Sequence, residues 1–161
     1  MMELSEKDLA KAKETFENVC ALLDGDEWKY QKDEEKFMIR FSARGEDIPM
    51  DFIVYIDPHP GLVQLVSVLP FRVSKERMVD AAIASCAINN RLKNGTFDFD
   101  ISEGMIKFRV SQAYFDSAIG QEVFRYMLIV SGRTVDDYND KFLMLSKGNL
   151  ELKDFLEQIN Q

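Results

Sequence analysis

Several features that mark familiar classes of protein are scarce in this chain of 161 residues. It has one histidine and two cysteines, and none of them stands at the spacing of zinc ligands. No apolar run approaches the ~20 residues that are needed to cross a bilayer. The motifs GxxxxGKS/T, GxGxxG, GxSxG and HExxH do not occur, so nucleotide-binding, hydrolase and zincin chemistry lack support. We expect no enzymatic activity, no metal and no cofactor.

Positive charge is also in short supply. The net charge is −8 and the isoelectric point is near 4.7, and no cluster of Lys and Arg stands out. Nucleic-acid binders neutralise phosphates with such clusters, so we expect neither a nucleic-acid nor a membrane partner. The N-terminus is charged from its third residue and has no apolar h-region. We therefore expect no secretion signal and a cytoplasmic location.

The few reactive side chains have simple structural explanations. Cys20 and Cys86 both fall on the apolar stripe of a predicted helix, which favours buried, reduced thiols over a disulfide or a nucleophile. His59 lies between two prolines in a turn, and as a catalytic base it would need an orienting partner and a nucleophile. Asp57 is nearby, but a lone histidine in a turn is typically solvated. Acidic pairs such as Asp98 and Asp100 are in principle able to bind metal, but a hairpin already explains this pair.

Apolar periodicity predicts a helix, an antiparallel meander and a second helix. Ser5 is a suitable N-cap for a helix that ends at Gly25. Trp28 and Tyr30 belong to a short strand, and alternating residues predict three further strands, over residues 37–43, 48–56 and 62–70. Ser74 caps the second helix, whose apolar stripe contains Val79, Ile83, Cys86 and Asn90, and Asn94-Gly95 ends it.

A β-hairpin follows, with Glu103-Gly104 as its two-residue loop. This loop places Phe99 opposite Phe108 and Asp98 opposite Arg109. One face of the hairpin is then apolar and the other is charged, and opposite charges across the ladder help to set the register. We expect the buried face to contain Phe97, Phe99, Ile101, Ile106, Phe108 and Val110, with Asp98, Asp100, Lys107 and Arg109 on the other face.

Helical periodicity returns after the hairpin. One helix begins near Asp116 or Ser117 and runs to Gly132, and a capping box at Thr134-x-x-Asp137 restarts a helix that Gly148 ends. A tail helix over Leu152–Ile159 completes the chain. No repeat or linker interrupts this order. We predict a single domain, residues 1–161, with an α+β fold: a twisted antiparallel sheet, meander plus hairpin, packed with helices.

One group of apolar residues falls on the sheet face that should be exposed to solvent and therefore polar. If the turn RGED closes the first meander hairpin, Met38 faces Ile53. If DPHPG closes the second, Tyr55 faces Val63 and Ile53 faces Leu65. Such a patch needs a cover, either a helix or a second subunit or client protein. We favour the helix Leu152–Ile159, and we keep the five residues as candidate protein-binding positions: Met38, Ile53, Tyr55, Val63 and Leu65.

Four stretches give the chain a family resemblance: LVSVLPFRVSKERM, the paired asparagines of INNRL, NGTFDFD and EGMIKFRVS. With the order of elements, they resemble the bacterial YbjN-like proteins, whose fold is similar to that of type III secretion chaperones. The match runs from Phe37 to Leu145. The resemblance implies a small cytoplasmic homodimer that binds proteins, and it brings no catalytic motif.

The first hypothesis is therefore a non-enzymatic, chaperone-like module that captures an extended or amphipathic client segment. A second is a sensory or regulatory domain that binds a small ligand between sheet and helices. An unrecognised enzyme is a third.

Overall fold

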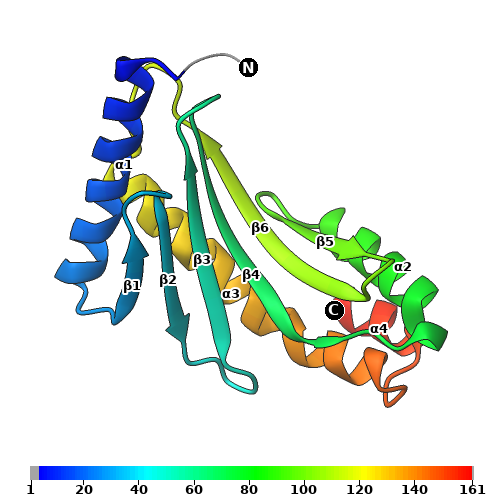
Figure 1. Cartoon of the computed structure of the whole chain (residues 1–161). Coiled ribbons are helices and arrows are strands. Elements are labelled where there is room, and N and C mark those ends of the chain that lie inside the picture. The colour runs from blue at the N-terminus through cyan, green and yellow to red at the C-terminus, as the bar shows by residue number, and fades with distance from the viewer. Residues whose placement is uncertain (1–3, 161) are drawn as a thin grey trace.

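An antiparallel sheet of six strands, in the order β1-β2-β3-β4-β6-β5, forms the centre of the computed structural model, which describes residues 4–160 (Figure 1). The strands are β1 Tyr30–Asp33, β2 Met38–Ala43, β3 Met50–Asp57, β4 Leu62–Arg72, β5 Thr96–Asp100 and β6 Met105–Ala113. The helices are α1 Glu6–Gly25, α2 Met78–Asn89, α3 Gln121–Ser146 and α4 Leu152–Ile159, and the short 3-10 turn η1 Lys75–Arg77 precedes α2. The predicted α+β fold is confirmed.

The helices form one layer. The long helix α3 packs on β3, β4 and β6, and α1 packs on α3 and β3 (Figure 1). The helix α2 lies beside the edge strand β5, and α4 packs on α2 and α3. The prediction that the tail helix covers the second face of the sheet is wrong, because α4 belongs to the same layer as the other helices. No other helix of residues 4–160 covers that second face.

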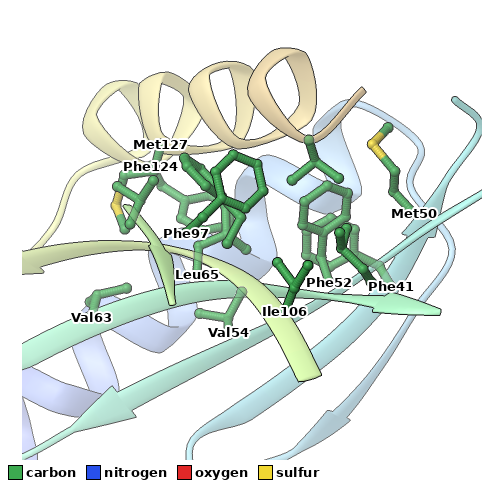
Figure 2. Close-up of a cluster of buried hydrophobic side chains, with 14 of the residues drawn as sticks. Phe41, Met50, Phe52, Val54, Val63, Leu65, Phe97, Ile106, Phe124 and Met127 are labelled. Carbon is green, nitrogen blue, oxygen red and sulfur yellow. The ribbon is translucent and has the colours of Figure 1, made fainter. Parts of the chain in front are cut away.

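The core fills the space between this layer and the sheet. Phe52, Leu65 and Phe97 from the strands meet Phe124 from α3 there, and each is at most 2% exposed (Figure 2). Burial of a large apolar side chain stabilises the fold by roughly 1.5–3 kcal/mol. A run of aromatic contacts then links Phe97 through Phe142 to Phe155, so α4 is joined to the same core.

Both ends of α1 follow local rules. The Ser5 hydroxyl accepts a hydrogen bond from the Asp8 N–H at 3.1 Å, and the Asp8 carboxylate accepts one from the Ser5 N–H at 3.3 Å. This is the reciprocal capping box of a helix start. At the other end, Glu27 takes a left-handed φ of 57°, and the Trp28 N–H donates to the Leu23 carbonyl at 2.8 Å. This closure sets the position of Trp28.

The hairpin β5–β6 has the predicted faces but not the predicted register. Phe97 lies opposite Phe108 and Phe99 opposite Ile106, a shift of two residues along the ladder. The loop has four residues, 101–104, because the Asp100 carboxylate accepts hydrogen bonds from the N–H groups of Ser102 and Glu103. A two-residue shift keeps every side chain on its face. The predicted burial of Ile101 is wrong, since it lies in the loop and is 62% exposed. Phe99, also predicted to be buried, is only half-buried at the edge of the core.

The meander registers were also predicted incorrectly. Phe41 pairs with Phe52, two residues from the predicted pairing, because the connection between β2 and β3 is longer than the turn RGED. In the next hairpin Val54 pairs with Leu65, a shift of one residue. A shift of one residue moves a side chain to the opposite face, and it therefore changes the composition of the predicted patch.

The buried face of α2 is opposite to the predicted one. Val79 and Ile83 are 65% and 44% exposed, and Cys86 is exposed as well, so the predicted burial of this thiol is wrong. Helix α2 is apolar on both sides, and its small residues allow it to approach its neighbours closely. The residues that it buries are Ala81, Ala84, Ser85 and Ile88.

The helix α2 also ends earlier than predicted. Its last residue is Asn89, not a position beside Gly95. The Asn89 side-chain amide donates to the Phe97 carbonyl at 2.9 Å and accepts from the Phe97 N–H at 2.8 Å. These bonds occupy both backbone groups of Phe97, and so they protect this point of the edge strand.

The predicted break at Gly132 does not occur. The helix α3 begins at Gln121 and continues through Gly132 and Thr134 to Ser146. Gly in a helix costs about 1 kcal/mol relative to Ala, and the buried residues on both sides of Gly132 outweigh that cost. None of the described helices is both long and apolar enough to cross a membrane.

Candidate functional site

The uncovered face of the sheet is the first candidate site. Its side chains alternate along the strands with the buried ones. The registers place Arg40 beside Ile53, Ile53 beside Val66, and Val66 beside Arg109. Four strands thus contribute one row, with two aliphatic side chains between two arginines.

Further apolar side chains adjoin this row. Tyr55 follows two residues after Ile53 on β3, and it lies between Met38 and Gln64. Val66 is only 7% exposed although no helix of residues 4–160 lies over it, so its neighbours in the sheet shield it. A shallow hollow of about 700 Å³ opens over this region. Its lining includes Ile53, Tyr55, Gln64, Val66, Val68 and Met105.

The charges around the hollow are mainly positive. Lys36, Lys107 and Arg109 line it together with the carboxylate of Asp57. Lys36 is paired with Asp33 at 3.5 Å, so Lys107 is the lining cation that keeps its charge free for a partner in the described part of the chain. Arg109 is held in place by Asp98 through two hydrogen bonds, of 2.8 and 3.2 Å. The hydrogen bond to Asp98 raises the pKa of Arg109, which stays charged. The hollow therefore suits an apolar partner that carries acidic groups.

Three of the five predicted protein-binding residues lie on this face. Met38 and Ile53 are half-buried and Tyr55 is 41% exposed. Val63 and Leu65 are fully buried in the core, so their predicted place in the patch is wrong. The one-residue shift of the β3–β4 register is the cause, and it brings Val66 and Val68 to the outer face instead. The structure closes this hairpin over residues 58–61, a turn one residue shorter than the predicted DPHPG, and that difference accounts for the shift.

The reactive residues do not form a catalytic group. His59 is exposed in the turn between β3 and β4, where its backbone N–H donates to Asp57 at 2.9 Å. Cys20 is buried, and burial raises the pKa of its thiol. Within residues 4–160, no three His, Cys, Asp or Glu side chains come together in a way that would hold a metal ion.

A second candidate site is a cavity of about 420 Å³ beside α3, where β2 ends and β3 begins. Trp28, Met50 and Phe52 supply apolar walls. Arginines and aspartates from α3 and from the connections at this end of the sheet complete the lining. The sequence did not reveal this cavity, because its residues come from separate segments: Asp26, Ala43, Arg44, Arg125, Leu128, Ile129, Gly132, Arg133 and Asp136.

Fold and surface together define an α+β protein with one helical layer and one uncovered sheet face. The chain belongs to the YbjN family: the sequence profile of that family, described as "Putative bacterial sensory transduction regulator", matches residues 15–144. The predicted resemblance to YbjN-like proteins is thus confirmed, whereas the likeness to type III secretion chaperones stays a prediction.

A solved structure has the same fold. It is described as "Crystal structure of YbjN, a putative transcription regulator from E. coli", and it superposes with a TM-score of 0.55 at 10% sequence identity. The match covers 83% of this chain and 90% of that chain. No curated protein matches the sequence.

Proposed function

We propose that this chain is a non-enzymatic, chaperone-like protein-binding module that captures an amphipathic helix on the uncovered face of its sheet. The observation that carries the proposal is the aliphatic pair Ile53 and Val66 between Arg40 and Arg109. Apolar groups gathered on one face mark a surface for a partner. Regulation, the role in the family description, is compatible with capture of another protein.

The geometry of the face favours a helix over an extended segment. Strands β2, β3, β4 and β6 each have a neighbour on both sides, so their backbone groups are already paired. An extended client lying across this face would leave its own backbone groups unpaired, whereas a helix satisfies them internally. Strand addition needs a free edge. On the edge strand β5, Asn89 already occupies Phe97, and the other edge strand, β1, has only four residues to pair with a client.

Charge defines the client further. Among the described residues, Lys107 in the hollow and Arg40 at the other end of the row have no carboxylate within ion-pair distance, whereas Lys36 and Arg109 are already paired. A helix with apolar residues on one stripe and glutamates beside them fits this pattern. A helix flanked by lysines is repelled.

A defined peptide tests the proposal. The probe is a fluorescein-labelled helical peptide with a leucine stripe and glutamates on its polar face, and binding is measured by fluorescence anisotropy. We expect Ile53→Asp to weaken binding at least about tenfold, because it introduces a buried charge opposite the leucines. The matched control is Tyr126→Asp, which changes an exposed aromatic residue on α3 and should leave the affinity unchanged. Equal affinities of the two variants, or tighter binding of the same peptide with lysines, would contradict the proposal.

The protein also has a surface that suits a second copy of itself. Val79, Ile83, Cys86 and Asn90 form an exposed stripe on α2 with the alternating spacing of a helix seam. In an antiparallel pair of α2 helices, Ile83 of one copy meets Cys86 of the other. We propose that the expected homodimer forms through this stripe, which leaves the sheet face of each copy free for a client.

A second candidate function has support of its own. The cavity beside α3 lies between sheet and helices, where a sensory domain would hold a small ligand. The family description names sensory transduction. In this proposal the chain is a ligand-binding regulatory domain.

A further inference from the structure

The cavity beside α3 has the size and the lining of a small-molecule site. Its volume, about 420 Å³, lies within the range of ~300–1,000 Å³ that is usual for ligand pockets. We propose that it binds a small organic acid with an apolar or aromatic body. This inference rests on the second candidate function, ligand sensing, and names its ligand class; it is independent of protein binding at the sheet face.

The apolar walls come from three parts of the fold. Phe52 on β3 is 1% exposed and stacks on Phe41 at a centroid distance of 5.4 Å. Trp28 meets Phe41 edge to face at 5.3 Å, and Met50 lies at the same end of the core (Figure 2). Leu128 closes the cavity from α3. The half-buried Trp28 and Leu128 leave surface that would contact an aromatic or aliphatic ligand, and the buried Phe52 and Met50 support this surface from behind.

Two of the three arginines that line the cavity, Arg44 and Arg133, remain available to bind the carboxylate of a ligand. Arg125 is already neutralised by Asp26 through contacts of 2.6 and 3.3 Å. In the described part of the chain, neither Arg44 nor Arg133 has a carboxylate within ion-pair distance. The guanidinium fork matches a carboxylate with two parallel hydrogen bonds.

Asp26 and Asp136, the two aspartates of the lining, do not cancel the positive charge that favours a carboxylate ligand. Asp136 accepts a hydrogen bond from the Glu46 N–H at 2.9 Å, so it holds the connection between β2 and β3 against α3. With three arginines against two aspartates, the lining has a net charge of +1, although the whole chain carries −8. The cavity is thus a locally positive site on an acidic protein.

At two positions that border the cavity, the residue type is one that the local backbone conformation disfavours. Glu27, between the lining residues Asp26 and Trp28, has a left-handed φ of 57° that glycine would adopt more easily. Gly132 lies in the middle of α3, and a Cβ added there would meet nothing within 4 Å. Locally unfavourable choices collect at functional sites. Here the turn at Glu27 sets the position of Trp28, and Gly132 leaves space beside α3 because it has no side chain.

Trp28 provides a direct measurement, because it is the only tryptophan of the chain. Its fluorescence is followed during titration of the protein with three probes of similar size: phenylacetate, its neutral isostere phenylacetamide and cationic 2-phenylethylamine. We expect a saturable change with phenylacetate, and binding of the amide and the amine weaker by about tenfold or more. These two probes separate the contribution of charge from that of the aromatic ring.

Variants locate the binding. Gly132→Leu places a side chain into the open space, and it should abolish the response to phenylacetate. Arg44→Gln and Arg133→Gln should each weaken phenylacetate binding about fivefold or more and leave amide binding unchanged. Arg91→Gln, whose guanidinium contacts Asn160 instead, is the matched control and should bind as the parent does. Circular dichroism confirms that each variant is folded, and the two glutamine variants decide the question if Gly132→Leu does not fold.

Each contrary outcome has a defined meaning. If the amide or the amine binds as tightly as the acid and Gly132→Leu abolishes the response, the site remains a ligand site, but the organic-acid class is wrong. If Gly132→Leu folds and binds phenylacetate like the parent, the acid binds elsewhere and the inference fails. If no probe gives a saturable change up to about 20 mM, both this inference and ligand sensing at the cavity are overturned.

Discussion

Single residues with special backbone or hydrogen-bonding roles join distant segments of this protein. Gly95 takes a φ of +79°, and a Cβ at this position would collide with the ring of Phe108. Only glycine satisfies both conditions, and this explains why a glycine stands in the stretch NGTF. Tyr114 has a comparable role, because its hydroxyl donates to the Asp57 carbonyl at 3.0 Å and ties the end of β6 to the end of β3.

Tyr114 leads to a prediction about alkaline pH. Burial, with the nearby carboxylates of Asp57 and Asp8, raises the pKa of Tyr114 from 10.0 to about 12. Because the folded-state pKa is raised, its contribution to stability is complete below pH 10 and is lost as the pH rises through the folded-state value. Tyr114→Phe should lower the free energy of unfolding by about 0.5–1.5 kcal/mol at neutral pH.

Urea unfolding at neutral and alkaline pH measures this effect, and ultraviolet absorbance follows the ionisation. Tyr126→Phe, at an exposed position on α3, is the control and should change neither the free energy of unfolding nor the late, high-pH step of the absorbance titration that belongs to Tyr114. An absorbance titration in which Tyr114 ionises together with the exposed tyrosines would contradict the assignment.

At the scale of elements, α4 stabilises the helical layer rather than the sheet. Phe155 is fully buried and its ring lies 5.6 Å from that of Phe142 on α3. The Arg77 guanidinium donates to both carboxylate oxygens of Glu151, at 3.0 and 3.1 Å, just before α4 begins. This pairing lowers the pKa of Glu151. The tail helix therefore continues the core at the end opposite to the cavity.

Truncation of one side chain tests this role of α4. Phe155→Ala should lower the free energy of unfolding by about 3–5 kcal/mol, as expected for a large side chain removed from a core. Lys153→Ala on the exposed side of the same helix should cost far less. Denaturant unfolding gives both values, and anisotropy with the glutamate peptide should show unchanged binding by folded Phe155→Ala protein. A loss below about 1 kcal/mol for Phe155→Ala would show that α4 is not part of the core.

The whole molecule has two apolar surfaces with different surroundings. The sheet face is broad and lined with cations, whereas the α2 stripe is narrow and consists of Val79, Ile83 and Cys86. A two-fold axis beside α2 would bring the stripe of one copy against the same stripe of a second copy, so this surface is able to pair with itself. The sheet face has no such symmetry.

If the α2 stripe and not the sheet face forms the dimer, substitutions on the two surfaces should change the oligomeric state differently. Sedimentation should show a dimer for the parent chain and for Ile53→Asp, and a monomer for Ile83→Asp, because an aspartate at the centre of an apolar seam is buried without a partner. A dimer that survives Ile83→Asp but not Ile53→Asp would mean that the sheet face is the dimer surface.

Much of the fold was predictable because it depends on local chemistry. The capping box of Ser5 and Asp8, the end of the helical region at Gly148 and the alternation within β2 each depend on neighbouring residues. The faces of the hairpin β5–β6 were correct despite the wrong register, since an even shift preserves them. The family resemblance also rested on short local stretches of sequence, such as the paired asparagines of INNRL.

Tertiary structure decided what local periodicity leaves open. The β3–β4 register moved Val63 and Leu65 into the core, and only the actual length of the turn determines such a shift. Helix α2 is apolar on both sides, so its periodicity does not say which side packs. The sequence alone determined the order of the elements and local features such as the N-cap Ser5 and the helix stop at Gly148, because these depend on contacts over a few residues. Packing decided the bounds of α2, where the predicted cap Ser74 makes no capping hydrogen bond, and the unbroken course of α3. The uncovered sheet face and the cavity beside α3 depend on which segments meet across the chain, and packing of the whole fold decides that.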